Sequence, residues 1–186
     1  ADGSSYNGAV SLTLTSNEEA TGFAIGDIDA TGTGDCTFSS WSIDNADTIF
    51  SVTCTPDGQG TVVTQVAGGV FTDAAGNSNS ISNEYDWTHD SVAATISSFS
   101  LVANSAAVGD TITGTITADA AGYSNSATTI NGVAIDSFTD NNDNTYTVTW
   151  VVDEGATDRA AGTTPVSAVF SDGLNTNSAF TTASYG

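Results

Sequence analysis

The sequence almost lacks positive charge. It contains no Lys and a single Arg, Arg159, against 22 acidic residues, which gives a formal net charge of -21. Proteins that bind nucleic acid neutralise phosphates with Lys and Arg, and attraction to an anionic membrane surface needs the same residues. Both classes of partner are therefore excluded, as are Lys–Asn isopeptide cross-links. Because charges of one sign repel, we expect salt or divalent cations to favour the folded state.

Long apolar runs and helix-forming residues are scarce as well. No stretch of 18 apolar residues occurs, so we expect no insertion into a membrane. No charged region followed by an apolar one begins the chain, so we expect that any signal peptide has been removed. Met is absent, whereas Val, Ile, Tyr and Phe alternate with Thr and Ser, and hydrophobic residues make up 39% of the chain. This alternation predicts a folded, secreted, all-β protein and disfavours a disordered acidic chain.

The chain has two cysteines, Cys36 and Cys54, which bracket two predicted strands. A turn centred on Asn45 would place Cys36 opposite Cys54 and Phe38 opposite Val52, with both cysteines on the apolar face. We therefore predict a disulfide in the core, which implies an oxidising compartment. The alternative is a pair of buried free thiols. Zinc is disfavoured, because two thiols and one distant histidine make a poor ligand set.

Two segments recur along the chain in the same order. DNADTIFSVTC at 44–54 returns as DNNDNTYTVTW at 140–150, and VFTDAAGNSNS at 70–80 returns as VFSDGLNTNS at 169–178. The spacing of roughly 95–100 residues is the length of one small β-sandwich domain.

The repeat predicts two tandem immunoglobulin-like antiparallel β-sandwich domains. We place them at residues 1–91 and 92–186, with a short linker within 90–94. The alternation of Ile81, Asn83, Tyr85 and Trp87 with polar residues predicts a strand over 81–88 as the last of the first domain.

The first repeat apparently lacks its first strand. GAVSLTLTSN at 8–17 corresponds to DTITGTITAD at 110–119, and nothing in the first repeat corresponds to ISSFSLV at 96–102. A sandwich without that strand exposes a sheet edge and a groove into its core. Three explanations are open. The segment was cut from a longer array, a strand of a neighbouring molecule fills the gap by β-augmentation, or the terminal strand is merely atypical.

Three motifs resemble a known family. They are the TGF segment that begins at Thr21, the strand Phe50–Pro56 and the FTDAAGN turn that begins at Phe71. Through them residues 8–94 resemble the bacterial immunoglobulin-like repeats of large surface adhesins, and residues 95–186 resemble a more divergent relative. The resemblance implies a structural or adhesive protein, not an enzyme, at the extracellular cell surface. It would form a stalk or a filament, with like subunits or neighbouring repeats as partners.

Calcium is the one cofactor that the sequence suggests. Clusters of oxygen ligands suit Ca²⁺, and extracellular modules bind it weakly. Our candidate ligands are Asp73, Asp90 and Asp172. The alternative for Asp73 is a structural turn, in which its carboxylate accepts hydrogen bonds from nearby backbone amides.

Catalysis has little support, and sugar binding is the alternative function. The single histidine, His89, has no G-x-S-x-G motif to act with. Trp41, Trp87 and Trp150 could stack on surface glycans, as in a carbohydrate-binding module of a secreted protein. Trp150 stands where the first repeat has Cys54, which predicts that it lies in the core.

Overall fold

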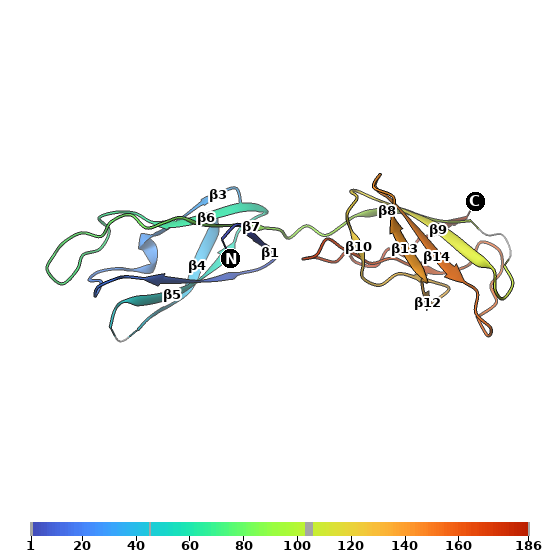
Figure 1. The fold of residues 1–186 in the computed structure, drawn as a ribbon, viewed down its shortest axis with the longest axis horizontal. Helices are drawn as coiled ribbons and strands as arrows, with labels where there is room; N and C mark the ends of the chain where they lie inside the picture. The colour runs from blue at the N-terminus through green and yellow to red at the C-terminus, as the bar shows by residue number, and fades with distance from the viewer. Residues whose placement is uncertain (1, 45, 103–105, 186) are drawn as a thin grey trace. The chain divides into compact units, whose positions relative to one another are not determined.

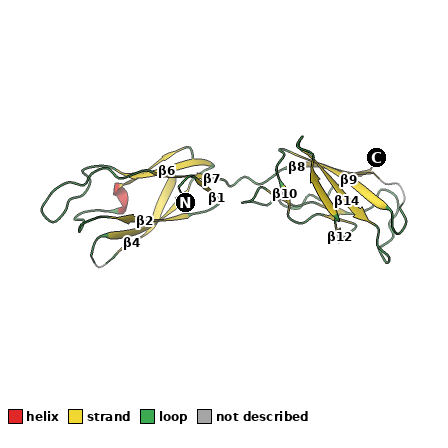
Figure 2. Cartoon of the chain, in the orientation of Figure 1, coloured by secondary structure: helices red, strands yellow, loops and turns green. Residues whose placement is uncertain are grey.

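The computed structural model describes residues 2–44, 46–102 and 106–185 (Figure 1). Apart from one short 3-10 helix, η1 (Ile25–Asp27), the regular structure in these residues is β-strand (Figure 2). The all-β prediction is therefore confirmed. The chain divides into two compact units, Ala1–Val92 and Ala93–Gly186.

The first unit is built from two sheets. One has four strands in the order β1, β7, β6, β3, and the other has three in the order β2, β5, β4. Figure 1 shows β3, β6 and β7 on one side of this unit and β5 on the other. The strands are β1 (Ser4–Tyr6), β2 (Val10–Thr15), β3 (Ile28–Gly32), β4 (Cys36–Ile43), β5 (Ile49–Pro56), β6 (Gly60–Val66) and β7 (Tyr85–His89).

Alternate residues of these strands form the core of the first unit. Along β5, Phe50, Val52 and Cys54 are buried while the residues between them are not. Val62 and Trp87, from the other sheet, are fully buried and belong to the same cluster. The period of two in the sequence thus becomes one apolar face on each sheet.

The second unit has one large sheet and two small ones. Its five-stranded sheet has the order β13, β14, β9, β8, β17, and the small sheets are β12-β11-β15 and β10-β16. The strands are β8 (Ile96–Val102), β9 (Thr111–Ala118), β10 (Ser124–Asn125), β11 (Thr129–Ile130), β12 (Val133–Ala134), β13 (Ser137–Asp140), β14 (Thr145–Val151), β15 (Val166–Ser167), β16 (Phe170–Ser171) and β17 (Ser184–Tyr185).

The core of the second unit surrounds Tyr146 and Phe170, whose rings meet edge to face at 4.7 Å. Val148 and Trp150 follow Tyr146 on the buried face of β14. Trp150 therefore lies in the core, as its place in the repeat predicts.

The predicted disulfide between Cys36 and Cys54 is confirmed, but the predicted strand register is wrong. The Cα atoms of the two cysteines are 5.6 Å apart. In the ladder Cys54 lies opposite Phe38, and Cys36 lies opposite Pro56. The pairs nearest the turn, such as Ile43 opposite Phe50, place its centre between Ala46 and Asp47 instead of at Asn45, and a β-bulge between Ser39 and Ser42 moves the later pairs by only one residue. The predicted turn centre, Asn45, lies outside the described residues.

The disulfide is expected to stabilise the first unit. We expect the double variant Cys36→Ala, Cys54→Ala to lose about 3 kcal/mol of unfolding free energy, because the open chain regains loop entropy. Urea unfolding followed by the fluorescence of Trp41 and Trp87 would measure the change. A variant as stable as the oxidised parent would contradict the expectation.

The last strand of the first unit is shorter than predicted. It begins at Tyr85, and Ile81 is 62% exposed. The backbone N–H of Ser82 donates to the carbonyl of Val66, while the N–H of Val66 donates to the hydroxyl of Ser82. Because a side chain takes the place of the backbone acceptor, the ladder ends before it reaches Ile81.

Candidate strand-acceptor groove

Strand β2 forms a free edge in the first unit. It is the first strand of its three-stranded sheet and pairs only with β5, whereas β9 of the second unit lies between β14 and β8. The two strand pairs are equivalent, since Leu14 lies opposite Phe50 in one and Ile116 lies opposite Tyr146 in the other. Where β8 completes the second unit, the described residues of the first unit provide no strand.

The strand that precedes this edge is placed differently in the two units. Residues 7–9 separate β1 from β2, and residues 103–110 separate β8 from β9. A three-residue loop can close a hairpin, but β1 does not pair with β2. Strand β1 instead pairs in parallel with β7, with Tyr6 opposite His89. The expectation of a missing first strand is thus corrected: a short first strand exists, but it belongs to the other sheet.

The free edge of β2 presents backbone groups at every second residue. The N–H of Ser16 donates to the carbonyl of Thr48 at 2.8 Å, in the register of the β2–β5 ladder. Because an antiparallel ladder alternates hydrogen-bonded and non-bonded pairs, the N–H and C=O groups of Ser11, Thr13 and Thr15 point away from β5. Such an edge is a template for one more strand.

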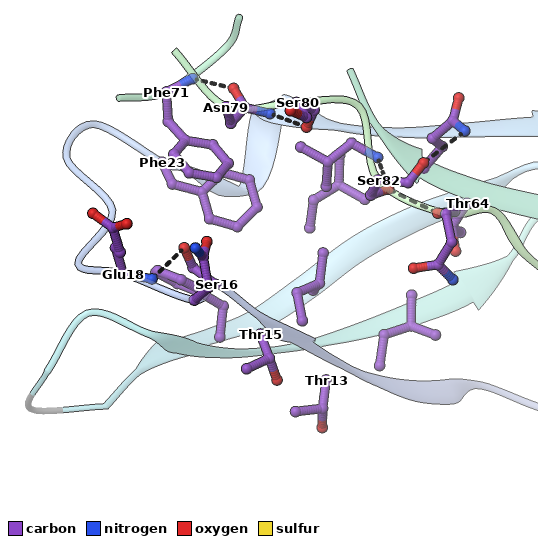
Figure 3. A pocket seen from close by; sticks show the side chains of 18 of the residues that line it. Thr13, Thr15, Ser16, Glu18, Phe23, Thr64, Phe71, Asn79, Ser80 and Ser82 are labelled. Carbon is purple, nitrogen blue, oxygen red and sulfur yellow. Dashed lines mark hydrogen bonds between the residues drawn. The ribbon is translucent and has the colours of Figure 1, made fainter. Parts of the chain in front are cut away.

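A groove of about 980 Å³ runs between this edge and the segment 78–85. We call it the acceptor groove. Figure 3 shows Thr13 and Thr15 on one side of it and Asn79, Ser80 and Ser82 on the other. Apolar side chains from both sheets and from two loops also line it: Leu12, Leu14, Phe23, Ile28, Phe50, Val66, Phe71 and Tyr85. An apolar lining flanked by unpaired backbone groups is suited to an extended peptide.

The far wall of the groove is fixed by the side chain of Asn79. Its Oδ1 accepts the N–H groups of Val70 and Phe71, at 2.9 and 3.0 Å. In the second unit the Oδ1 of Asn177 accepts the N–H of Phe170 in the same manner. This role of Asn79 was not predicted, although the shared NS at the end of both repeated turns was a signal for it.

The two units fill the space behind this edge differently. In the second unit Phe99 of β8 is buried opposite Ile116, and a Cβ atom at Gly114 would lie only 2.6 Å from its ring. The first unit has Leu12 at the position of Gly114, so its own side chain takes part of the space that β8 fills. Leu14, the counterpart of Ile116, is only half-buried and faces the groove.

This comparison makes a prediction for the second unit. We expect Gly114→Ala to lower its unfolding free energy by about 1–3 kcal/mol, because the ring of Phe99 must move to admit the methyl group. Thr115→Ala is the matched control on the opposite face of β9 and should cost less. Urea unfolding would measure the unfolding free energy of both variants. Equal losses in the two would contradict the explanation that the methyl group meets the ring of Phe99.

Three carboxylates line the groove near the carboxyl-terminal end of β2: Glu18, Glu19 and Asp73. Figure 3 shows Glu18 beside Ser16, whose hydroxyl accepts its backbone N–H. The side-chain amide and then the backbone N–H of Asn77 donate to the carboxylate of Asp73 and lower its pKa. Asp73 therefore remains ionised near neutral pH, and this end of the groove is negative.

The lowered pKa of Asp73 predicts a pH dependence. Its contribution to stability is present above the ordinary pKa of 3.8 and is lost as the pH falls through the lower folded value. We therefore expect the parent to be more stable than Asp73→Asn at about pH 7, with the difference vanishing in acid. Urea unfolding over this range would test it, with Glu84→Gln as an exposed control. A difference that persists in strong acid would rule out the carboxylate as its cause.

Each predicted calcium ligand is engaged by its own neighbours. Asp90 accepts hydrogen bonds from the Nε2 of Gln59 and the N–H of Val92, and Asp172 accepts the N–H groups that follow it in its turn. Within the described ranges no three acidic, histidine or cysteine side chains are grouped so that they could hold a metal ion. Calcium binding by Asp73, Asp90 and Asp172 stays a prediction, which thermal unfolding with and without added calcium would test.

His89 and the tryptophans contribute to the core of their units. The Nδ1 of His89 lies 2.7 Å from the carbonyl oxygen of Gly58, and the residue is buried. Trp87 and Trp150 are buried, and Trp41 stacks on the ring of Phe50 at 5.5 Å. Trp87 and Trp150 are therefore closed to a sugar, whereas sugar stacking on the partly buried Trp41 stays a prediction.

Residues 2–89 match the family model of the bacterial Ig-like domain. The match covers almost the whole of the first unit. The resemblance that its TGF and FTDAAGN motifs predict is thus confirmed. A comparison of the chain with curated proteins found no match.

Two solved adhesin structures are similar to the chain. One is the Escherichia coli adhesin FdeC, at 17% identity and a TM-score of 0.38, over 94% of this chain and 57% of that one. The other is the Yersinia pseudotuberculosis adhesin InvE, at 17% identity and a TM-score of 0.29, over 95% of this chain and 55% of that one. The chain thus spans little more than half the length of either structure. Among the described residues no helix is long and apolar enough to cross a membrane.

Proposed function

We propose that the chain is a structural module of an adhesive protein at the bacterial cell surface, and that its Ig-like domain accepts a β-strand from a neighbouring subunit or repeat. The observation that carries this proposal is the free edge of β2, at the place where β8 completes the second unit. Strand donation would link successive modules non-covalently, as a stalk or a filament requires.

Other features support an extracellular, non-enzymatic role. The disulfide between Cys36 and Cys54 suits an oxidising compartment. His89 is buried, with its Nδ1 beside a backbone carbonyl. The carboxylates of Asp73 and Asp172 accept hydrogen bonds from backbone N–H groups of their own turns. A net charge of -21 keeps such modules soluble at high local density.

Amide hydrogen exchange would test strand acceptance directly. The probe is a synthetic peptide with the sequence of β8 in which Val replaces Phe99, ISSVSLV, because Leu12 leaves no room for the ring; it is added to the intact chain. We expect it to slow exchange at the outward N–H groups of Ser11, Thr13 and Thr15. Thr113, Thr115 and Thr117, which β8 already covers, are the matched controls and should not change.

The variant Thr13→Pro complements this test. Proline removes the outward N–H and places its ring on the free edge, where the ladder to β5 does not need that donor. We expect loss of peptide binding with little change in melting temperature, whereas Thr13→Ala should bind as the parent does. Binding by Thr13→Pro, or no protection in the parent, would overturn strand acceptance at β2.

A further inference from the structure

We infer that the strand accepted by the groove carries a basic side chain at its amino-terminal end, and that it comes from polypeptide other than a second copy of these 186 residues. This inference rests on the proposed function and names the chemistry of its partner. It follows from the direction that the fold imposes on the strand and from the charges at one end of the groove.

The second unit shows which direction the strand takes. β8 runs antiparallel to β9, with Ile96 opposite Ala118 and Val102 opposite Thr113. In the repeat Ala118 corresponds to Ser16, and Thr113 corresponds to Ser11. A strand that occupies the same place beside β2 therefore has its amino-terminal end near Ser16 and its carboxyl-terminal end near the start of β2.

The same comparison sets the side chains that face the core. Phe99 of β8 lies opposite Ile116, the counterpart of Leu14, and its ring lies only 2.6 Å from where a Cβ atom at Gly114 would be. The first unit has Leu12 at the position of Gly114, so a ring of that size would meet the side chain of Leu12. An apolar residue smaller than Phe is therefore expected opposite Leu14.

The amino-terminal end of such a strand meets negative charge. Beyond Ser16 the chain continues into Glu18 and Glu19, and Asp73 lines the same groove. In the second unit the chain that enters β8 also passes a carboxylate, since Asp119 accepts the N–H of Thr95 at 2.9 Å. A Lys or Arg just before the apolar residues would pair with the carboxylates of the first unit, and an acidic residue there would be repelled.

A second copy of the chain fits this requirement poorly. It has no Lys, and its single Arg, Arg159, lies outside the strands and donates through Nε to Asn131. Two copies with a net charge of -21 each also repel one another. The donor is therefore a segment of different sequence, apolar at alternate positions and basic at its amino-terminal end.

Three peptides would test the charge requirement. Each is acetylated and carries the sequence ISSVSLV, which is β8 with Val in place of Phe99, preceded by Lys-Lys, Ser-Ser or Glu-Glu. We expect fluorescence anisotropy with the intact chain to give affinities in the order Lys, Ser, Glu, with roughly tenfold between the first and the last at low salt. The difference should shrink as salt screens the charges.

A charge reversal in the protein sharpens the test. The double variant Glu18→Lys, Glu19→Lys should reverse the order of the three peptides, whereas the control Asp153→Lys in the second unit should leave it unchanged.

The outcomes separate this inference from the function on which it rests. Equal affinity for all three peptides would overturn the charge requirement but leave strand acceptance standing. Binding of none would overturn strand acceptance itself. Light scattering adds a third outcome. If the purified chain forms a polymer that Thr13→Pro abolishes, a second copy is the donor, and the inference is wrong although the proposed function stands.

Discussion

The pairing of β1 with β7 leaves the edge of β2 free. Because β1 belongs to the other sheet, β2 has one hydrogen-bonded neighbour among the described residues. Unpaired backbone groups at a sheet edge attract a further strand, and proteins usually cover or charge such an edge. Here the edge carries Ser and Thr, which do not discourage pairing. The acceptor groove lies beside this free edge.

The two units fill the core beside β2 and β9 with different side chains. Where β8 is present, Gly114 leaves room for Phe99, and where no such strand lies, Leu12 takes part of that room. Protein interiors are close-packed, so a change on one strand is compensated on its neighbour. The groove beside Leu14 is the part of the space that Leu12 does not reach.

Patterns of period two were enough to predict the β-strands and their buried faces. Phe50, Val52, Tyr146 and Trp150 are buried because alternation in a strand depends on backbone geometry alone. The register of the cysteine strands was beyond such reasoning, since alternation does not determine where the turn between two strands is centred.

The groove was only half predictable from the sequence. The repeat showed that a strand has no counterpart in the first unit, but not that β1 crosses to the other sheet. The recurrence of Asn79 as Asn177 marked it as shared by both turns, but the repeat did not show that its side chain accepts hydrogen bonds from residues 8 and 9 positions away.

The parallel pairing of β1 with β7 has a mechanical consequence. These strands stand at the two ends of the first unit's chain, and they point in the same direction. Tension between those ends pulls the strands lengthwise past each other. The hydrogen bonds between the three residue pairs then bear the force at the same time, in shear, and do not break one after another. The second unit pairs β8 with β17 in the same sense. Each unit is thus arranged to resist stretching along its own chain.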